Sequence, residues 1–306
     1  MPPTAAGAAA TQAAYYIISS MSRASADRLH GVLFNKGMCL LNYRLKQRKI
    51  DIRLPHCWYK HGDIVVEYWM PPNVQWPKPN EEQTYVYWHG PAPKALSDAQ
   101  LQKEIIAAAE RLRDEFPEDE NGINRIVTEV YKFAPFEFQR LFKDVFLLLR
   151  LWYNPGTSVQ AFVSDRFRPR FTQLKESFPA GDFPDLVLDM EKYAFVVGTL
   201  LEKPEGVRFL IDGLSEDFWL HFCKSLRLHP SGHENVPDQT LEIWRREKDA
   251  SVEVFEVKLK YWVERAARES GVTEFDKPSV KDWLFPSSWG PLSKDSSLAI
   301  DETVYS

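Results

Sequence analysis

Hydrophobic positions between residues 27 and 49 recur with a helical period and fall on two sides of the helix that they predict. One stripe consists of Leu29, Leu33, Leu40 and Tyr43, and the other of Phe34, Met38, Leu41 and Leu45. A surface helix has a single apolar stripe, so two stripes indicate burial on most sides. Asp27 is a suitable N-cap, and the basic last turn suits the negative end of the helix dipole. We therefore expect a central helix from Asp27 to about Lys49.

The pattern changes after Pro55, where a helix cannot continue. The segments IVVEYWM at 64–70 and TYVYWHG at 84–90 are β-branched and aromatic, and Gly62-Asp63 before them is typical of a turn. We expect the two segments to pair as a hairpin across the proline-rich residues between them. A helix followed by a hairpin with a long loop is the outline of a winged-helix unit.

Helical periodicity returns at residue 97 and dominates the remaining pattern. Ser97 and Gln100 have the spacing of a capping box, and several apolar segments with helical spacing follow up to Gly271. The fold class that we expect is mainly α, a helical bundle with a small winged-helix-like β-hairpin near the N-terminus. We expect a disordered alanine-rich N-terminus at 1–22, a basic helix-plus-hairpin unit at 23–95, a helical domain at 97–271 and an extended tail at 272–306, with the boundary between the two folded parts near residues 90–120.

Composition supports a folded protein of ordinary class. Of the 306 residues, 44% are hydrophobic, which is enough to build a sizeable core. The charged fraction of 26% is close to the average of globular proteins. The three cysteines include no CxxC pair, which favours a reducing compartment. The first residues lack the basic start of a signal peptide, and no apolar run reaches the ~18 residues of a membrane span. We expect a cytoplasmic protein that does not enter the membrane.

The charge is unevenly distributed. From Arg23 to Lys60 there are nine basic residues and two acidic ones, a net charge of +7. Because the whole chain carries −5, the remainder carries −12. A basic segment on an acidic chain either binds an external partner or pairs with the acidic part of its own chain. The sequence leaves both alternatives open.

The external partner would meet the basic residues and the aromatic residues beside them. This predicted contact surface consists of Arg44, Lys46, Arg48, Lys49, Arg53, Trp58 and Tyr59. The leading interpretation is that another protein binds there, and the alternative is a winged-helix-type regulator that binds DNA through the same face. The aromatic residues could equally belong to the core, which is their more common location.

The densest group of metal-ligand residue types lies in PHCWYKHGD at 55–63. His56, Cys57 and His61 provide a C-x3-H pair and one further imidazole, and Cys39 or His89 could complete a zinc site. Dedicated zinc sites usually show two close pairs, and this segment has one. We therefore predict no metal and no cofactor, and keep His56, Cys57 and His61 as the alternative.

An enzymatic alternative arises near the C-terminus. Pro237-Asp238 followed by Glu256-Val257-Lys258 resembles the motif of PD-(D/E)xK nucleases. That resemblance implies that Asp238 and Glu256 bind a divalent metal while Lys258 helps to activate water, and it requires a strand around residues 251–261. Val252, Phe255, Leu259, Trp262 and Ala266 instead have helical spacing, which favours a helix there.

The opening helix and turn resemble a second family. The helical sequence KGMCLLNYRL at 36–45 and the turn HGDI at 61–64 look like the start of Panacea-type (SocA-like) antitoxin domains, with Asp63 where that family has proline. The resemblance covers residues 27–90 and implies a protein that acts by binding another protein. We expect a non-catalytic, antitoxin-like regulatory or defence-associated interaction protein.

Overall fold

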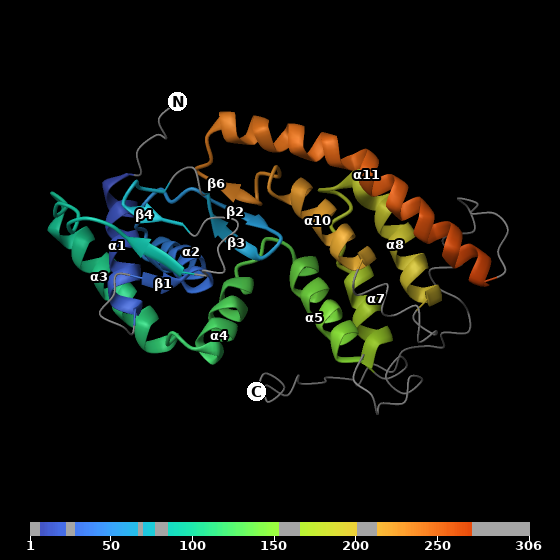
Figure 1. The fold of residues 1–306 in the computed structure, drawn as a ribbon, viewed down its shortest axis with the longest axis horizontal. Coiled ribbons are helices and arrows are strands. Elements are labelled where there is room, and N and C mark those ends of the chain that lie inside the picture. Colours follow the sequence, from blue (N-terminus) through green and yellow to red (C-terminus); the bar gives the residue numbers. More distant parts are fainter. Residues whose placement is uncertain are drawn as a thin grey trace. The chain divides into compact units, whose positions relative to one another are not determined.

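The chain folds into two compact units, shown in Figure 1 for a computed structural model that describes residues 7–22, 28–66, 70–76, 85–152, 166–200 and 213–270. Unit 1 contains the described residues up to Ala134 together with Pro230–Thr240. Unit 2 contains those from Pro135 to His229 and from Leu241 onward. Helices dominate both units and the strands are few, so the prediction of a mainly α protein with a small β element is confirmed.

The predicted boundary near residues 90–120 is wrong, because two further helices belong to unit 1. They are α3 (Ala99–Glu115) and α4 (Glu120–Tyr131), and both pack against α2 (Gly31–Gln47). The N-cap of α3 is Asp98, one residue after the predicted Ser97, and its carboxylate accepts hydrogen bonds from two amides of the first turn. The predicted tail at 272–306 lies outside the described residues.

Helix α2 is the central helix that its two stripes predict. It contacts α1 (Ala8–Met21), α3, α4 and strands of both sheets, and Leu33, Phe34, Leu40 and Leu41 are fully buried. The prediction that it begins at Asp27 is wrong, because Arg28–His30 form strand β1. The helix is capped instead by His30, whose Nδ1 accepts the amide of Val32. Cross-strand pairing of β1 competes successfully with the helical preference of these three residues.

The alanine-rich N-terminus is helical and not disordered between Ala8 and Met21, which corrects the prediction for residues 1–22. One face of α1 is completely or almost completely buried: Ala10, Ala13, Ala14, Ile17, Ile18 and Met21. These positions keep the spacing of an amphipathic helix, and alanine has the highest helix propensity. Gly37 of α2 faces this side of α1, where a Cβ atom would be in ordinary van der Waals contact with Ile17 and Met21 at 3.4–3.5 Å.

The strands form two small antiparallel sheets, and the predicted pairing of 64–70 with 84–90 is wrong. One sheet has the order β3-β2-β6, from Gly62–Val65, His56–Tyr59 and His233–Glu234. The other has the order β1-β5-β4, in which Tyr85–Trp88 lie between Arg28–His30 and Val74–Gln75. The hairpin is therefore the tight β2–β3 pair, where Gly62 adopts a φ of +85° and a Cβ atom would meet the Tyr131 ring at 3.0 Å.

Unit 2 is built on aromatic side chains from helices that are separate in sequence. Its helices are α5 (Glu137–Trp152), α7 (Arg168–Glu176), α8 (Val187–Leu200), α10 (Ser215–Leu226) and most of α11 (Asp238–Ser270), with a short 3₁₀ turn at Pro184–Leu186. Phe138 of α5 meets Phe222 of α10 with ring centroids 4.9 Å apart. Tyr193 of α8 stacks on Phe218 of α10 at 4.4 Å.

Helix α11 is the long orange helix of Figure 1. Its inner face packs on α10, where Phe255 stacks against His221 at 4.1 Å and Lys258 pairs with Asp217 at 2.8 Å. Among the described residues, no helix combines the length and the apolar character that a bilayer crossing needs.

Candidate functional site

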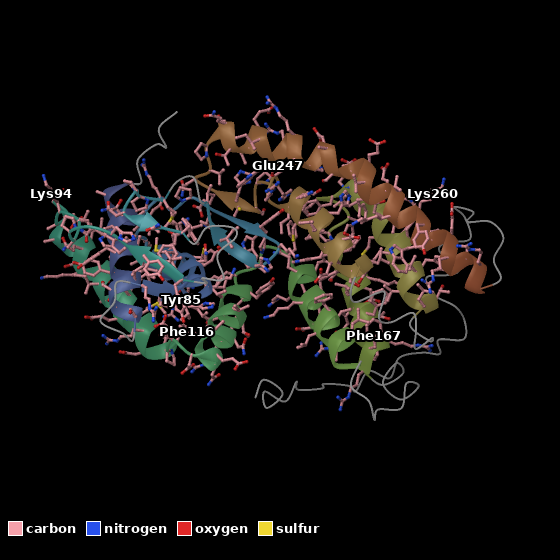
Figure 2. The ribbon with its side chains drawn as sticks, in the orientation of Figure 1. Tyr85, Lys94, Phe116, Phe167, Glu247 and Lys260 are labelled. Atoms are coloured by element: carbon pink, nitrogen blue, oxygen red, sulfur yellow. The ribbon has the colours of Figure 1, made fainter. Side chains whose placement is uncertain are left out.

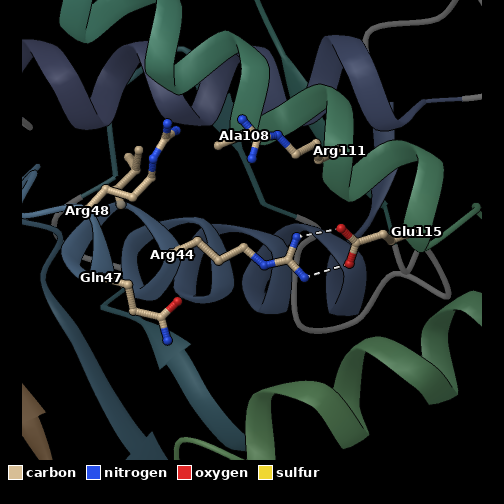
Figure 3. A pocket seen from close by; sticks show the side chains of 7 residues that line it. Arg44, Gln47, Arg48, Ala108, Arg111 and Glu115 are labelled. Atoms are coloured by element: carbon tan, nitrogen blue, oxygen red, sulfur yellow. Dashed lines mark hydrogen bonds and ion pairs between the residues drawn. The ribbon is translucent and has the colours of Figure 1, made fainter.

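Two helices of unit 1 enclose a pocket that brings arginines together. The cavity measures about 320 Å³ and lies between α2 and α3 (Figure 3). Its lining consists of Arg44, Leu45 and Gln47 from α2, of its C-cap Arg48, and of Ala108, Arg111 and Glu115 from α3. Arg44 and Arg48 are one helical turn apart, and so are Arg111 and Glu115, so each helix presents two charged side chains to the same space. We call this site the arginine pocket.

Carboxylates of α3 hold the two α2 arginines in place. Both oxygens of Glu115 accept hydrogen bonds from the Arg44 guanidinium, at 2.9 and 2.6 Å, and Figure 3 shows this pair as two dashed lines. Arg48, one turn further along, forms an ion pair with Glu104 through a single nitrogen. Arg111 is exposed, and it adds a third guanidinium to a lining that contains one carboxylate. Bidentate pairs are geometrically specific, so the pocket presents oriented donors.

The structure separates the other members of the predicted contact surface from the pocket. Lys46 pairs with Glu234 of β6, while Lys49 and Arg53 are exposed beyond the end of α2 with positive φ angles of 64° and 52°. Trp58 is 2% exposed and packs edge-on against Tyr131, and Tyr59 is half-buried. For Trp58, core packing is therefore the correct interpretation. Of the seven predicted residues, Arg44 and Arg48 form part of the pocket.

A second group of polar side chains is buried beneath the β2–β3 hairpin. Asp63, which is fully buried, accepts hydrogen bonds from the Tyr43 hydroxyl at 2.7 Å and from His56 Nδ1 at 2.9 Å. His56 Nε2 lies 3.2 Å from a carboxylate oxygen of Glu234. Lys36 of α2, 2% exposed, donates to the Asp63 carbonyl at 2.7 Å. We call Lys36, Tyr43, His56, Asp63 and Glu234 the buried charge network.

The pKa values show that this network is a charged one. Burial disfavours the imidazolium of His56, but the Asp63 charge and the hydrogen bonds to Asp63 and Glu234 outweigh it and raise the pKa to about 9. Burial alone would raise the pKa of Asp63, yet His56, Tyr43 and Lys36 lower it. The hydrogen bond from His56, with Lys46 nearby, lowers the pKa of Glu234 to about 2. The network thus holds cations against anions at neutral pH.

The metal alternative of His56, Cys57 and His61 does not correspond to the geometry. In the part of the chain that the structure describes, Cys39, His56 and Asp63 are the group of three ligand types whose atoms lie within 4.8 Å of one another. Both Asp63 oxygens and His56 Nδ1 are already engaged with each other or with Tyr43. Burial raises the pKa of the Cys39 thiol well above its ordinary value, which keeps it protonated. This arrangement fits a structural ion network better than a metal centre or a thiol nucleophile.

The strand that the nuclease alternative requires around residues 251–261 is a helix in the structure. Asp238, Glu256 and Lys258 all lie on α11, and residues 251–261 are helical throughout. At 1.5 Å per residue, the eighteen-residue separation places Asp238 and Glu256 about 27 Å apart along the helix axis. Lys258 is paired with Asp217. The two carboxylates therefore do not converge on one ion, and we withdraw this alternative.

Sequence reasoning missed Arg111, Glu115 and Lys36 as site residues. The signal for Arg111 and Glu115 was their helical spacing on the polar face of α3, but nothing in the sequence indicated that this face meets Arg44. Lys36 stands in an apolar stretch of α2, and a buried lysine in such a stretch signals an internal partner. No family model, curated protein or solved structure matches the chain.

Proposed function

We propose that this chain is a non-catalytic binding protein that takes an acidic segment of another protein into the arginine pocket. The observation that carries the proposal is the convergence of Arg44, Arg48 and Arg111 on one cavity of about 320 Å³. Guanidinium groups bind carboxylates in a planar, two-point geometry, and Arg44 already shows that geometry with Glu115. An incoming Asp or Glu side chain would pair with Arg111, because Glu115 and Glu104 already pair with the other two guanidiniums.

A protein partner fits the pocket better than a nucleic acid. The pocket is lined by the carboxylate of Glu115 as well as by arginines, and Glu104 neutralises Arg48 beside it. A phosphate backbone is bound through several unpaired cations, and Lys46, which would extend such a cluster, pairs with Glu234. A peptide that carries both charges and apolar side chains complements this mixed lining and the apolar Leu45 and Ala108 within it. The resemblance to Panacea-type antitoxin domains implies the same mode of action, and we include an antitoxin-like regulatory role in the proposal.

The test compares two arginines of α3 that are two residues apart. Arg111→Glu reverses a charge in the pocket, whereas Arg113→Glu reverses an exposed charge that pairs with Asp114 and does not line the pocket. A displayed library of random peptides is selected on the wild-type protein, and the enriched peptides are then measured against both variants. We expect enrichment of Asp- or Glu-centred peptides, with affinity about 10-fold weaker for Arg111→Glu and unchanged for Arg113→Glu.

Two results would contradict the proposal. One is a set of enriched peptides that binds Arg111→Glu as tightly as the wild-type protein. The other is binding of duplex DNA that falls steeply with salt and is abolished by combined charge reversal at Arg44, Lys46 and Arg48, which would establish the DNA-binding alternative in its place.

A further inference from the structure

The outer face of α11 carries an apolar stripe that no described side chain covers. Ile243, Val254, Val257 and Tyr261 are 41%, 58%, 66% and 54% exposed, and they account for four of the five large hydrophobic residues that are exposed in the described chain. Ala250 is exposed as well. Isolated exposed apolar residues are ordinary, but several on one helix indicate an interaction surface.

The spacing of these residues makes a narrow seam. From Ile243 the apolar positions follow at intervals of seven, four, three and four residues: 243, 250, 254, 257 and 261. With 3.6 residues per turn they fall within about 60° of one another around the helix. The buried side chains Trp244, Phe255, Leu259 and Val263 belong to the opposite face, which packs into unit 2. An interval that alternates between three and four is the repeat by which one helix packs along another in a coiled coil.

We propose that this seam joins two copies of the chain through an antiparallel contact of α11 with α11. A twofold axis crossing the seam between Val254 and Val257 places Val254 of each copy against Val257 of the other. The same axis places the small Ala250 against the large Tyr261, so two inner layers each hold two valines and the two outer layers each hold one small and one large side chain. A twofold contact of this kind is self-complementary, because each pair occurs twice.

Charges beside the seam support the same partner and the same direction. In the antiparallel arrangement, Glu253 of one copy lies beside Lys260 of the other at the edge of the central layers. Both side chains are exposed. Figure 2 shows Lys260 on the outer side of this helix. In a parallel arrangement Lys260 would instead lie beside Arg265 of the second copy, where like charges repel, and Glu253 would meet Lys258, which already pairs with Asp217 of its own chain. The charges beside the seam therefore favour the antiparallel orientation.

The first test measures the mass of the whole protein in solution by sedimentation equilibrium, from roughly 1 to 200 µM, because a seam this short gives a micromolar contact. We expect the wild-type protein to approach twice the 35.5 kDa of one chain at the upper concentrations. Val257→Glu puts two charges into the central layers and should weaken the dimer by at least about 100-fold. Glu256→Lys, an exposed change outside the seam, should leave the dimer intact. Because Val257 is exposed, far-UV circular dichroism should show both variants folded.

The second test determines the direction of the helices. Glu253→Lys and Lys260→Glu should each weaken the dimer by roughly 3- to 10-fold, and the double variant should regain wild-type affinity because the pair is restored with its charges exchanged. A tighter dimer for Lys260→Glu alone would overturn the antiparallel arrangement, since that is the result of a parallel contact with Arg265. A wild-type protein that stays monomeric throughout, or a dimer that tolerates Val257→Glu, would overturn the proposal as a whole.

Discussion

The cores of the two units are stabilised by different kinds of interaction. Beneath the β2–β3 hairpin, unit 1 buries Lys36, His56 and Asp63, three ionisable residues that are each less than 5% exposed. In unit 2 the space among α5, α8 and α10 is filled with aromatic rings, such as Phe142 stacked on Trp219 with centroids 4.7 Å apart. A buried ion pair must recover the free energy of desolvation through good geometry, whereas aromatic rings are stabilised by the area that they remove from water.

Because of this difference, pH should affect the stability of the two cores differently. The free energy of the charge network depends on which groups are protonated, so the stability of unit 1 depends on pH. The phenylalanine and tryptophan rings of unit 2 carry no titratable proton, and burial raises the pKa of Tyr193 still further above its ordinary range. The contribution of these rings to the stability of unit 2 should therefore depend on packing and not on pH. Three predictions can break or sharpen this contrast.

The largest effect is expected in the aromatic core. Phe222→Ala removes a fully buried ring that meets Phe138, Phe178 and Phe183, and it should lower the free energy of unfolding by about 4 kcal/mol. Hydrogen exchange followed by mass spectrometry should show faster exchange in α10 and α5, with the same increase at mildly acidic and mildly alkaline pH. Leu188→Ala, at a partly exposed position of α8, is the matched control with little effect.

Removing the central anion should have the next largest effect. Asp63→Asn removes the fully buried carboxylate that faces His56 and leaves Glu234 as the counter-charge of this histidine, so it should cost unit 1 about 3 kcal/mol at neutral pH. The same exchange measurement should place the loss in β2 and β3 and leave α10 unaffected. Asp114→Asn, which changes an exposed carboxylate paired with Arg113, serves as the control. Equal protection of β2 in Asp63→Asn and wild type would show that the network contributes no net stability.

The smallest effect is the pH dependence of the wild-type protein. The pKa of His56 is raised to about 9 in the folded state, so its stabilising contribution is complete below about pH 6.5 and is lost as the pH rises through about 9. We expect a loss of roughly 2 kcal/mol between these limits, measured as the free energy of unfolding in urea. In His56→Gln this part of the pH dependence should disappear. An identical slope in both proteins would refute the charged state of His56.

The fold was predictable where one local pattern determines the structure. The two stripes of residues 27–49 gave the buried central helix, and the helical spacing of Phe255, Leu259 and Trp262 correctly favoured a helix over the nuclease strand. The same kind of pattern was present in Ala10, Ala13 and Ile17, but the alanine-rich composition around it was interpreted as disorder. Composition was a poorer guide than spacing there, because alanine both forms helices and allows close packing.

The wrong predictions concern contacts between segments that are far apart in the sequence. Whether Tyr85–Trp88 pair with 64–70 or with Arg28–His30 depends on contacts across more than fifty residues, and both pairings satisfy the local alternation. The basic residues pose the same problem. Arg44 and Arg48 were correctly selected, but the carboxylates that hold them belong to a helix that sequence reasoning had assigned to another domain. Sequence spacing predicted which side chains share a helix face, but it did not predict which face lies opposite.

The route of the chain has a consequence for how unit 1 is made. Strand β6 joins β2 from 178 residues downstream, as the contact between His56 and Glu234 shows, after the chain has passed through unit 2. During synthesis, β2 therefore emerges from the ribosome long before its outer neighbour exists. Closing so long a loop costs little more free energy than closing one half as long, because the entropic cost grows only with the logarithm of the loop length. The hazard is kinetic: until β6 arrives, the nascent protein presents an unpaired strand edge, to which other growing chains can add.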